Sequence, residues 1–560
     1  MSSKREDGSG TPPRWAGALA GLAAAAAALG AGELVVGIVG DDDPSLVAAV
    51  GAEFIDRFAA SLKDIAVELF GTNDKVALVV GIVIMSMLFG ALLGVVAVKR
   101  FLVAALGFVA FGLVGFAAYR ADELGRPATG LVASVVAAGV GVATLRWLFW
   151  IWAHPPSTVA AMSMGRGAGD AERVTSSDAA TVDDGVLSGG RLIGAPRSSM
   201  DPREVARRTF LAAVAAAGVA AGAVALLGRR MAGRGASEAA RLEVVLPASG
   251  DPAPTVSQPF TVEEVSTYIT PNEDFYRIDT ALTIPQVSLD DWKLDFTGSI
   301  DNPFSISYQE LLDMDPVEHA VTIACVSNEV GGNLVGNAVW RGVPLAALLE
   351  RAGVPEGLQG PEGQLVGRSL DGWAAGFPMD VALDGRTALV AYAMNGEPLP
   401  VRHGFPARLI VAGLYGYVSA TKWLAAVEVT RWDDFDGYWI PRGWAKEGPI
   451  KTMSRIDVPR PGADLAEGPV TVGGVAWAPT RGIARVEVQV DEGDWQECEL
   501  GRVQSNDTWV QWRYRWQAEP GEHRIAVRAT DGTGEVQTSE VASPAPDGAS
   551  GWHGRRVRVG

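Results

Sequence analysis

Long apolar runs separated by short polar segments dominate the first 153 residues of the 560-residue chain. Two of these runs, 76–98 and 130–153, are each long enough to cross about 30 Å of hydrocarbon as a helix. The run 101–118 is shorter but still sufficient, and 15–40 forms an Ala- and Gly-rich first span. The pattern predicts four membrane spans. A buried helical core is the alternative, because apolar helices also fill protein interiors.

The charges between the apolar runs predict which ends lie in the cytoplasm. Basic residues precede the first run and form the link 99–100, whereas three aspartates, 41–43, follow the first run. Short cytoplasmic loops are enriched in Lys and Arg. The N-terminus and the link are therefore expected to be cytoplasmic, and the segment that opens with the aspartates is expected to be external.

A fifth apolar run, 207–228, follows a stretch rich in Gly, Ser, Ala and Asp, 155–206, which is typical of a flexible cytoplasmic linker. Arg207 and Arg208 open this run. The pair is interpreted either as a twin-arginine export signal in an internal position or as ordinary cytoplasmic anchors. Five crossings from a cytoplasmic N-terminus place everything after this run outside the cytoplasm.

Charge and composition exclude several classes of function. The chain carries 65 acidic and 47 basic residues, a net charge of −18, whereas nucleic-acid binding needs clustered Lys and Arg. Two cysteines, Cys325 and Cys498, form neither a disulfide scaffold nor a four-thiolate zinc site. No apolar run carries histidines placed to hold a haem axially, so no haem is expected in this chain.

After residue 241 the pattern changes to short strands, short helices and turns rich in Gly and Pro. An apolar strand is predicted over 320–326, and it leads into a polar, Gly-rich loop. Cys325 lies at the end of this strand, where a thiolate suits a soft metal ligand or a nucleophile. The alternatives are a small buried hydrophobic side chain and a disulfide with Cys498.

The motifs that follow Cys325 come in a specific order. They are Trp340-Arg341-Gly342-Val343-Pro344-Leu345, Asp371-Gly372-Trp373, Met394-Asn395-Gly396-Glu397-Pro398-Leu399, His403-Gly404-Phe405-Pro406-Ala407-Arg408, Tyr415-Gly416 and Lys422-Trp423. From about residue 270 to 439, this ordered set resembles the sulfite-oxidase family of molybdopterin-dependent oxidoreductases. The resemblance implies a molybdenum–molybdopterin cofactor bound by an α+β domain, 257–447, which follows a linker, 229–256.

The resemblance also implies roles for individual residues. Cys325 is expected to bind molybdenum through its thiolate. Arg408 and Lys422 match positions that hold the pterin and its phosphate, and His403 matches a position that hydrogen-bonds the cofactor. The other expected cofactor contacts are Phe275, Tyr276, Arg277, Ser369, Ser419 and Thr421.

One departure from the family pattern bears on the substrate. Tyr276 and Arg277 are expected to act in catalysis with Cys325. Sulfite-oxidising members typically show an Arg-Asn-His triplet shortly after the aromatic pair, with the arginine facing the oxyanion. This chain has Arg277-Ile278-Asp279-Thr280, with the arginine one position early and an acid in place of the amide. Because a carboxylate repels a dianion, Asp279 argues against sulfite as the substrate.

Segments with period-two alternation recur beyond residue 450, at 470–475, 484–490, 509–516 and 523–529, with turn signals between them. Several short strands at such spacing indicate a β-sandwich. The segment 448–560 resembles the immunoglobulin-like dimerisation domain of the same family, which implies a homodimer as a candidate assembly.

The sequence thus predicts an α-helical membrane region (1–154 and the fifth span), an α+β sulfite-oxidase-type molybdopterin domain and an all-β immunoglobulin-like sandwich. The expected function is oxygen-atom transfer on a small substrate by an extracytoplasmic enzyme anchored in membrane lipid. Because no haem ligands are present, electrons are expected to pass to a separate cytochrome or quinone system. The alternatives are a sulfoxide reductase for oxidised methionine and a non-catalytic membrane scaffold with a degenerate molybdopterin fold.

Overall fold

The computed structural model describes residues 11–40, 43–57, 74–154, 202–231, 236–253, 260 and 262–560. Within these residues, five helices are long and apolar enough to cross a membrane, as the apolar runs predict. They are α1 (Arg14–Val39), α3 (Asp74–Ala97), α4 (Phe101–Ala121), α5 (Pro127–Ala153) and α7 (Pro202–Met231). Most of the predicted cytoplasmic linker, 155–201, lies outside the described residues.

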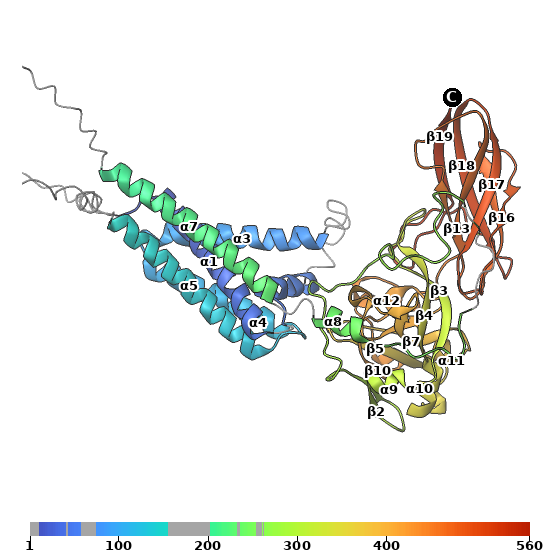
Figure 1. The fold of residues 1–560 in the computed structure, drawn as a ribbon, viewed down its shortest axis with the longest axis horizontal. Helices are drawn as coiled ribbons and strands as arrows, with labels where there is room; N and C mark the ends of the chain where they lie inside the picture. The colour runs from blue at the N-terminus through green and yellow to red at the C-terminus, as the bar shows by residue number, and fades with distance from the viewer. Residues whose placement is uncertain are drawn as a thin grey trace, which may run out of the picture.

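The five helices form a bundle in which α1 packs against α3, α5 and α7 (Figure 1). Glycines let the helices approach closely, since a Cβ atom added to Gly94 of α3 would overlap the carbonyl oxygen of Gly17 of α1. Small residues commonly permit such backbone contact between membrane helices. Large apolar side chains point outward instead, and Leu102 and Val219 are 72% and 75% exposed. The outer surface therefore suits a lipid environment.

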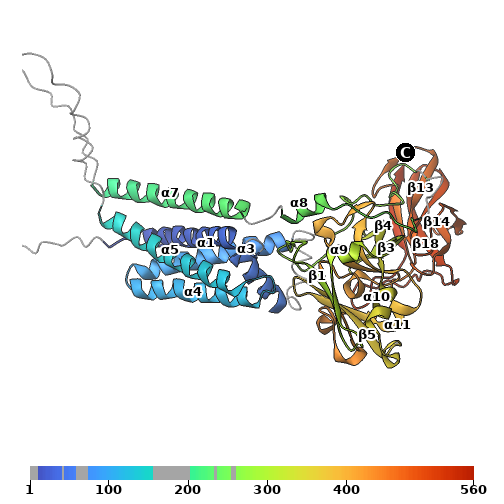
Figure 2. The ribbon, with the colours of Figure 1, turned by 60° about the horizontal axis from the view of Figure 1, so that its bottom comes forward.

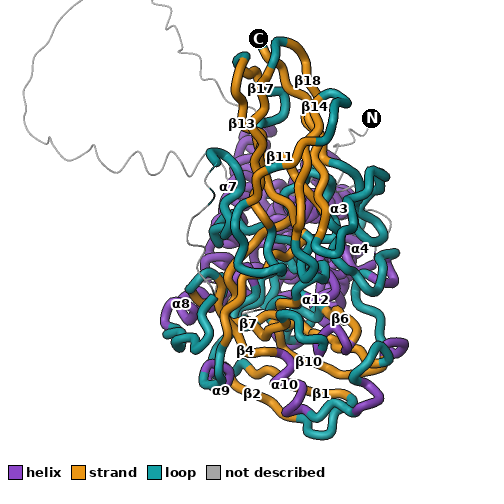
Figure 3. Tube along the Cα trace, turned by 90° about the vertical axis from the view of Figure 1, so that its right-hand side faces the viewer, coloured by secondary structure: helices purple, strands orange, loops and turns teal. Residues whose placement is uncertain are grey.

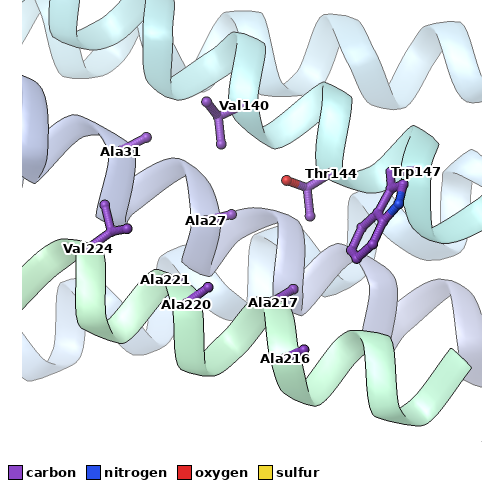
Figure 4. A pocket seen from close by; sticks show the side chains of 10 residues that line it. All are labelled: Ala27, Ala31, Val140, Thr144, Trp147, Ala216, Ala217, Ala220, Ala221 and Val224. Carbon is purple, nitrogen blue, oxygen red and sulfur yellow. The ribbon is translucent and has the colours of Figure 1, made fainter. Parts of the chain in front are cut away.

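A hollow of about 450 Å³ lies between α1, α5 and α7 (Figure 4). Alanine and valine side chains line most of it, and Thr144 and Trp147 are the lining residues that carry polar side-chain atoms. An almost wholly apolar lining disfavours the binding of a charged substrate in this hollow.

Two five-stranded sheets build the domain that follows the bundle. In the first, β4 (Val335–Pro344) lies between β3 (Val317–Ala324) and β7 (Ala388–Met394), and β7 also pairs with β8 (Glu397–Pro398) and β9 (Arg408–Val411). The second has the order β2 (Phe304–Ser307), β1 (Lys293–Gly298), β10 (Leu424–Arg431), β5 (Gly363–Ser369) and β6 (Ala374–Pro378). The short helices are α9 (Tyr308–Leu312), α10 (Leu345–Ala352), α11 (Met379–Leu383) and α12 (Gly416–Ser419). This is the predicted α+β architecture.

Two further sheets form the C-terminal domain, and their strands lie side by side at the C-terminal end of the molecule (Figure 3). One has the order β11 (Met453–Val458), β13 (Gly468–Trp477), β17 (Val510–Ala518) and β16 (Glu499–Leu500). The other has the order β12 (Asp464–Leu465), β19 (His553–Val559), β18 (Gly521–Asp531), β14 (Ile483–Val490) and β15 (Gln496–Glu497). Alternate residues of the two sheets, among them Val488 and Trp512, share one core. The predicted β-sandwich is confirmed, whereas its immunoglobulin-like character stays a prediction.

The sandwich is fixed to β3, the strand that leads to Cys325. Trp477 and Trp509 of the sandwich are buried within the core of the preceding domain. The Trp509 amide donates to the Thr322 hydroxyl at 2.7 Å, and the Thr322 amide donates to the Asp507 carbonyl at 2.9 Å. Because Thr322 belongs to β3, the sandwich holds this strand in place.

The stretch predicted as a linker, 229–256, includes a helix that packs on the domain that follows. This helix is α8 (Ala236–Glu243), and it lies between the end of α7 and the sheets (Figure 2). The hydroxyl of Ser237 accepts a hydrogen bond from the Val287 amide, and Arg341 donates to the Pro247 carbonyl at 2.6 Å. The chain is therefore bound to the sheet domain soon after it leaves the bundle.

Candidate active site

Strand β3 carries Cys325 into the candidate site. The strand ends at Ala324, two residues earlier than predicted, because the chain turns into a loop there. The Cys325 amide still donates to the Leu334 carbonyl at 2.9 Å, which keeps the first loop residue in register with the neighbouring strand. The side chain is 7% exposed, and the Ser327 amide donates a long hydrogen bond, 3.4 Å, to its sulfur. The thiol is therefore buried and held at a defined position.

The second cysteine lies in a different part of the molecule. Cys498 is buried in the sandwich core, and neither it nor Cys325 forms a disulfide. Burial, assisted by the neighbouring carboxylate of Glu487, raises the pKa of Cys498 to about 12. Its thiol therefore stays protonated, and the disulfide alternative for Cys325 is wrong.

Phe275 and Tyr276 form a pair of stacked aromatic rings near Cys325. Their rings stack with centroids 5.4 Å apart, and Phe275 also meets Trp340 and His403 edge-on at 5.8 and 5.7 Å. Burial raises the pKa of the Tyr276 phenol, and the nearby Cys325 raises it further. Tyr276 is therefore a protonated phenol that can donate a hydrogen bond within the site.

His403 presents an acceptor nitrogen to the same space. Its Nε2 lies 3.2 Å from the Asn272 carbonyl, which requires the hydrogen on Nε2 and leaves Nδ1 as an acceptor. Nδ1 is buried and has no hydrogen-bond partner within the described part of the chain. Burial, together with the charges of Arg408 and Lys422, lowers the pKa of His403 to about 3, so the ring is neutral.

Arg408, on β9, is a buried cation. It is 2% exposed and donates to the carbonyls of His403, at 3.0 Å, and Ala420, at 3.4 Å. Its guanidinium lies over the Trp340 ring, 5.0 Å from the centroid. Nε is buried without a hydrogen-bond partner, and no carboxylate in the described ranges forms an ion pair with Arg408. A buried charge of this kind is costly unless an anion accompanies it.

A cluster of charges lies next to these groups, centred on Asp279. Lys422 and Arg277 donate to the same Asp279 oxygen at 3.1 and 2.8 Å, and Lys75 donates to the other at 2.7 Å. Burial alone would raise the pKa of Asp279, but these three cations lower it well below its ordinary value. Burial lowers the pKa of Lys422 to about 8, against the opposing effect of Asp279.

Comparison with known proteins identifies the family. Residues 281–439 match the family described as "Oxidoreductase molybdopterin binding domain". Chicken sulfite oxidase is 31% identical over 49% of this chain and 69% of its own length. The chain belongs to the sulfite-oxidase family. An uncharacterized oxidoreductase of Bacillus subtilis is 34% identical over 28% of this chain and 74% of its own.

Two further comparisons differ in how much of each chain they cover. Rat mitochondrial sulfite oxidase is 31% identical over 51% of this chain, and the chain spans 61% of that protein. Among solved structures, the sulfane dehydrogenase SoxCD of Paracoccus pantotrophus is 23% identical, with a TM-score of 0.43, over 50% of this chain and 80% of its own. The chain thus spans about three fifths of the first curated sulfite oxidases it matches.

The residues of this family member fit the molybdenum–molybdopterin cofactor that the comparisons imply. Two buried polar atoms, Nδ1 of His403 and Nε of Arg408, lack partners within the described residues, and such atoms are expensive to leave unpaired. A pterin offers N–H donors to the first, and its phosphate offers negative charge to the second. In the described part of the chain, no group of three or more His, Cys, Asp or Glu side chains could hold a metal ion.

Three of the predicted cofactor contacts use their hydroxyls within the protein. Ser419 donates to the Tyr415 carbonyl at 3.1 Å, and Thr421 donates to the Gly367 carbonyl at 3.4 Å. The hydroxyl of Ser369 accepts a hydrogen bond from the Asp371 amide at 3.4 Å. These side chains stabilise the loops around Lys422, and their role toward the cofactor stays a prediction.

The structure adds two residues that sequence reasoning did not assign to the site. Tyr415 is 4% exposed, and burial raises the pKa of its phenol to about 12 with a contribution from Cys325. Its place in the Tyr415-Gly416 motif was the signal that pointed to it. Lys75 had no such signal, because it precedes Asp279 by 204 residues in the chain.

The substrate argument from Asp279 does not hold as it stands. An isolated carboxylate would repel an anion, but this one is paired with Lys75, Arg277 and Lys422. Three cations therefore surround this one carboxylate, and the carboxyl of Asp371 lies nearby. The acid at this position therefore does not exclude an anionic substrate.

Proposed function

We propose that the chain is a membrane-anchored molybdenum oxidoreductase that transfers an oxygen atom to or from a small substrate outside the cytoplasm. The observation that carries the proposal is the arrangement around Cys325. Its buried thiol and the buried Arg408 both lie near the Tyr276 phenol, and Phe275 contacts both the Tyr276 ring and the His403 ring. When bound, the molybdenum cofactor supplies the oxygen-atom and two-electron chemistry. Belonging to the sulfite-oxidase family supports this reaction class.

The protein groups would divide the binding work among them. Cys325 would provide the thiolate for molybdenum, and Arg408 would offset the negative charge of the cofactor. His403 would accept a hydrogen bond at Nδ1, because its other nitrogen is bound to the Asn272 carbonyl. Tyr276 would keep its proton and donate a hydrogen bond beside the thiolate.

The proposed location rests on which helix ends meet. Trp15 at the start of α1 lies within 6.3 Å of Phe210 near the start of α7 and 5.6 Å from Trp152 at the end of α5, measured between ring centroids. The opposite end of the bundle faces the sheet domain (Figure 2). This arrangement supports an N-terminus and an enzyme domain on opposite sides of the membrane, and the basic residues before α1 favour the cytoplasmic side for the N-terminus. The external enzyme would pass electrons to a separate cytochrome or quinone system. Dimerisation through the sandwich stays a prediction.

Changing Cys325 to serine tests the proposed role directly. A serine hydroxyl replaces the soft thiolate with little change in volume, so Cys325→Ser should abolish dye-linked turnover while keeping the fold and the pterin. Molybdenum and pterin per chain are measured together with oxidation of sulfite and reduction of sulfoxides. The matched control is Cys498→Ser, which should stay close to wild type because Cys498 lies in the sandwich core.

Two results would contradict the proposal. Wild-type turnover by Cys325→Ser would show that the Cys325 thiolate is not needed as a molybdenum ligand. Purified wild-type protein without molybdenum and without either activity would instead favour the membrane scaffold. Reduction of sulfoxides without oxidation of sulfite would select the reductase as the physiological direction.

A further inference from the structure

The end of the helical bundle that faces the sheet domain contacts it at several points around the charge cluster. Asp56 accepts a hydrogen bond from the Tyr438 hydroxyl at 2.7 Å, and its carbonyl accepts one from Arg442 at 3.2 Å. Gly372 packs so closely against Glu123 of the loop between α4 and α5 that an added Cβ atom would lie 2.5 Å from the glutamate side chain. The bundle therefore contacts the enzyme domain through more than one segment of the chain.

Lys75 makes the contact that reaches the candidate site. It lies in the first turn of α3, and its Nζ donates to Oδ1 of Asp279 at 2.7 Å and to the Ala281 carbonyl at 2.8 Å. The Asp279 side chain is 7% exposed and that of Lys75 is 32% exposed, so the ion pair is only partly open to solvent. A pair of this kind is screened less by salt than a surface pair.

The other side of Asp279 faces two residues that are expected to contact the cofactor and the substrate. Its Oδ2 accepts hydrogen bonds from Arg277 at 2.8 Å and from Lys422 at 3.1 Å. If Lys75 were neutral, Asp279 would cancel half of the positive charge that these two residues carry. With Lys75 present, its charge offsets that of Asp279, and the charges of Arg277 and Lys422 remain available to an anion.

We propose that Lys75, carried by an apolar helix of the bundle, is a specificity-determining residue of the active site, which favours small oxyanions by offsetting Asp279. This inference rests on the proposed function and names the substrate class of the same site. It gives the helical bundle a second role besides anchoring, because the enzyme domain lacks this charge without it.

The test compares Lys75→Met, which removes the charge but keeps a long side chain, with Lys75→Arg, which keeps the charge. Lys75→Met should raise KM for sulfite roughly tenfold with kcat nearly unchanged, because the charge acts on an approaching anion. KM for a neutral sulfoxide should not change. Raising the ionic strength should narrow the difference in KM for sulfite between Lys75→Met and wild type, since salt screens the long-range attraction of an anion that approaches from solvent. Lys75→Arg should resemble wild type.

A contact across the same boundary provides the control. Tyr438→Phe removes the hydrogen bond to Asp56 without a change in charge, and it should leave both KM values at wild-type level. If Lys75 only fastened the bundle to the enzyme domain, Tyr438→Phe and Lys75→Met would act alike, on both substrates and without dependence on salt. That outcome would overturn the proposal.

Binding of sulfate, measured by isothermal titration calorimetry on the full chain in detergent, gives a readout that needs no turnover. The dissociation constant should rise roughly tenfold in Lys75→Met and stay near wild type in Lys75→Arg and Tyr438→Phe. An unchanged constant in Lys75→Met, or no sulfate binding by wild type, would overturn the inference. Failure of the proposed function would appear separately, as protein without molybdenum.

Discussion

Lys422 shows how the site holds positive charge away from water. Its amine donates to the Ile278 carbonyl and to Asp279, both at 3.1 Å, and its side chain is 11% exposed. Arg408 and Arg277 add like charges nearby, and burial is the largest cause of the lowered pKa of Lys422, about 8. An anion bound here would stabilise the protonated amine and raise this pKa again.

This arrangement predicts that anion binding weakens in alkaline solution. Below about pH 8 the amine is already protonated, so binding takes up no proton there. Above that pH, binding must take up a proton, and the affinity should fall by about tenfold per pH unit until the pKa of the bound form is reached. Calorimetry with inorganic phosphate on cofactor-free protein between about pH 7 and 10 measures this slope.

Lys422→Arg is the matched variant, because a guanidinium keeps its charge throughout this range. Its phosphate affinity should vary much less with pH above about pH 8. An equal decline in both proteins would show that a different group controls the pH dependence.

At the scale of single residues, the sequence predicted side chains but not their partners. The order of motifs led to Cys325 and Arg408, and both are buried beside the aromatic pair, as a cofactor site requires. The effect of Asp279 was misjudged, because its charge depends on Lys75, which comes from a distant helix. Contacts between distant segments follow no regular spacing in the sequence, and the secondary-structure propensities of the residues do not encode them.

At the scale of elements, glycine positions decide how the helices of the bundle pack. In α3, a Cβ atom at Gly94 would overlap the Gly17 carbonyl, and one at Gly90 would meet the Ala25 side chain and the Gly21 carbonyl. Gly81 of the same helix has nothing within 4 Å of such an atom. One helix therefore offers glycines that the packing requires and a glycine that it does not.

Gly94→Ala should consequently destabilise the bundle, whereas Gly81→Ala should not. Overpacking a close helix contact costs about 1–3 kcal/mol. Alanine at an open helical position is neutral or stabilises by up to about 1 kcal/mol through helix propensity. Unfolding in a detergent titration, followed by circular dichroism, gives both free energies. Equal effects of the two changes would show that α1 and α3 do not meet at Gly94.

Element boundaries could be predicted well where a periodic or apolar pattern is long. The run 101–118 begins where α4 begins, and the predicted strand 484–490 lies within β14. Short elements that depend on tertiary contacts were harder to predict from the sequence. The helix 236–243 was predicted as part of a linker. Its stability comes from tertiary contacts, such as that between Ser237 and Val287, which the local sequence does not show.

At the scale of the whole molecule, α7 is the bundle helix from which the chain continues to the enzyme domain, and its first turns carry the arginine pair. The Arg207 guanidinium lies 5.5 Å from the centroid of the Trp15 ring, and Arg208 forms an ion pair with Glu204 at 2.8 Å. These contacts give the pair a place in the folded bundle. They favour neither of its two interpretations, because an export signal acts before the bundle is assembled.

The two interpretations differ in what they require of the side chain. An anchor needs only positive charge, which lysine also carries, and lysine keeps a cation over the Trp15 ring. An export signal that is read by a receptor requires the arginines themselves. A cofactor that is buried in a folded domain favours export after folding, and therefore a receptor-read signal ahead of α7.

Replacing both residues, Arg207→Lys with Arg208→Lys, separates these requirements. If the pair is an export signal, protease added to intact cells should cleave the wild-type enzyme domain but not that of the variant. If the pair is an anchor, both domains should be cleaved, and molybdenum per chain should be unchanged. Arg229→Lys with Arg230→Lys, at the other end of α7, is the control for the chemical change alone and should not affect exposure. An exposed, molybdenum-loaded enzyme domain in the Arg207/Arg208 variant would exclude the export signal.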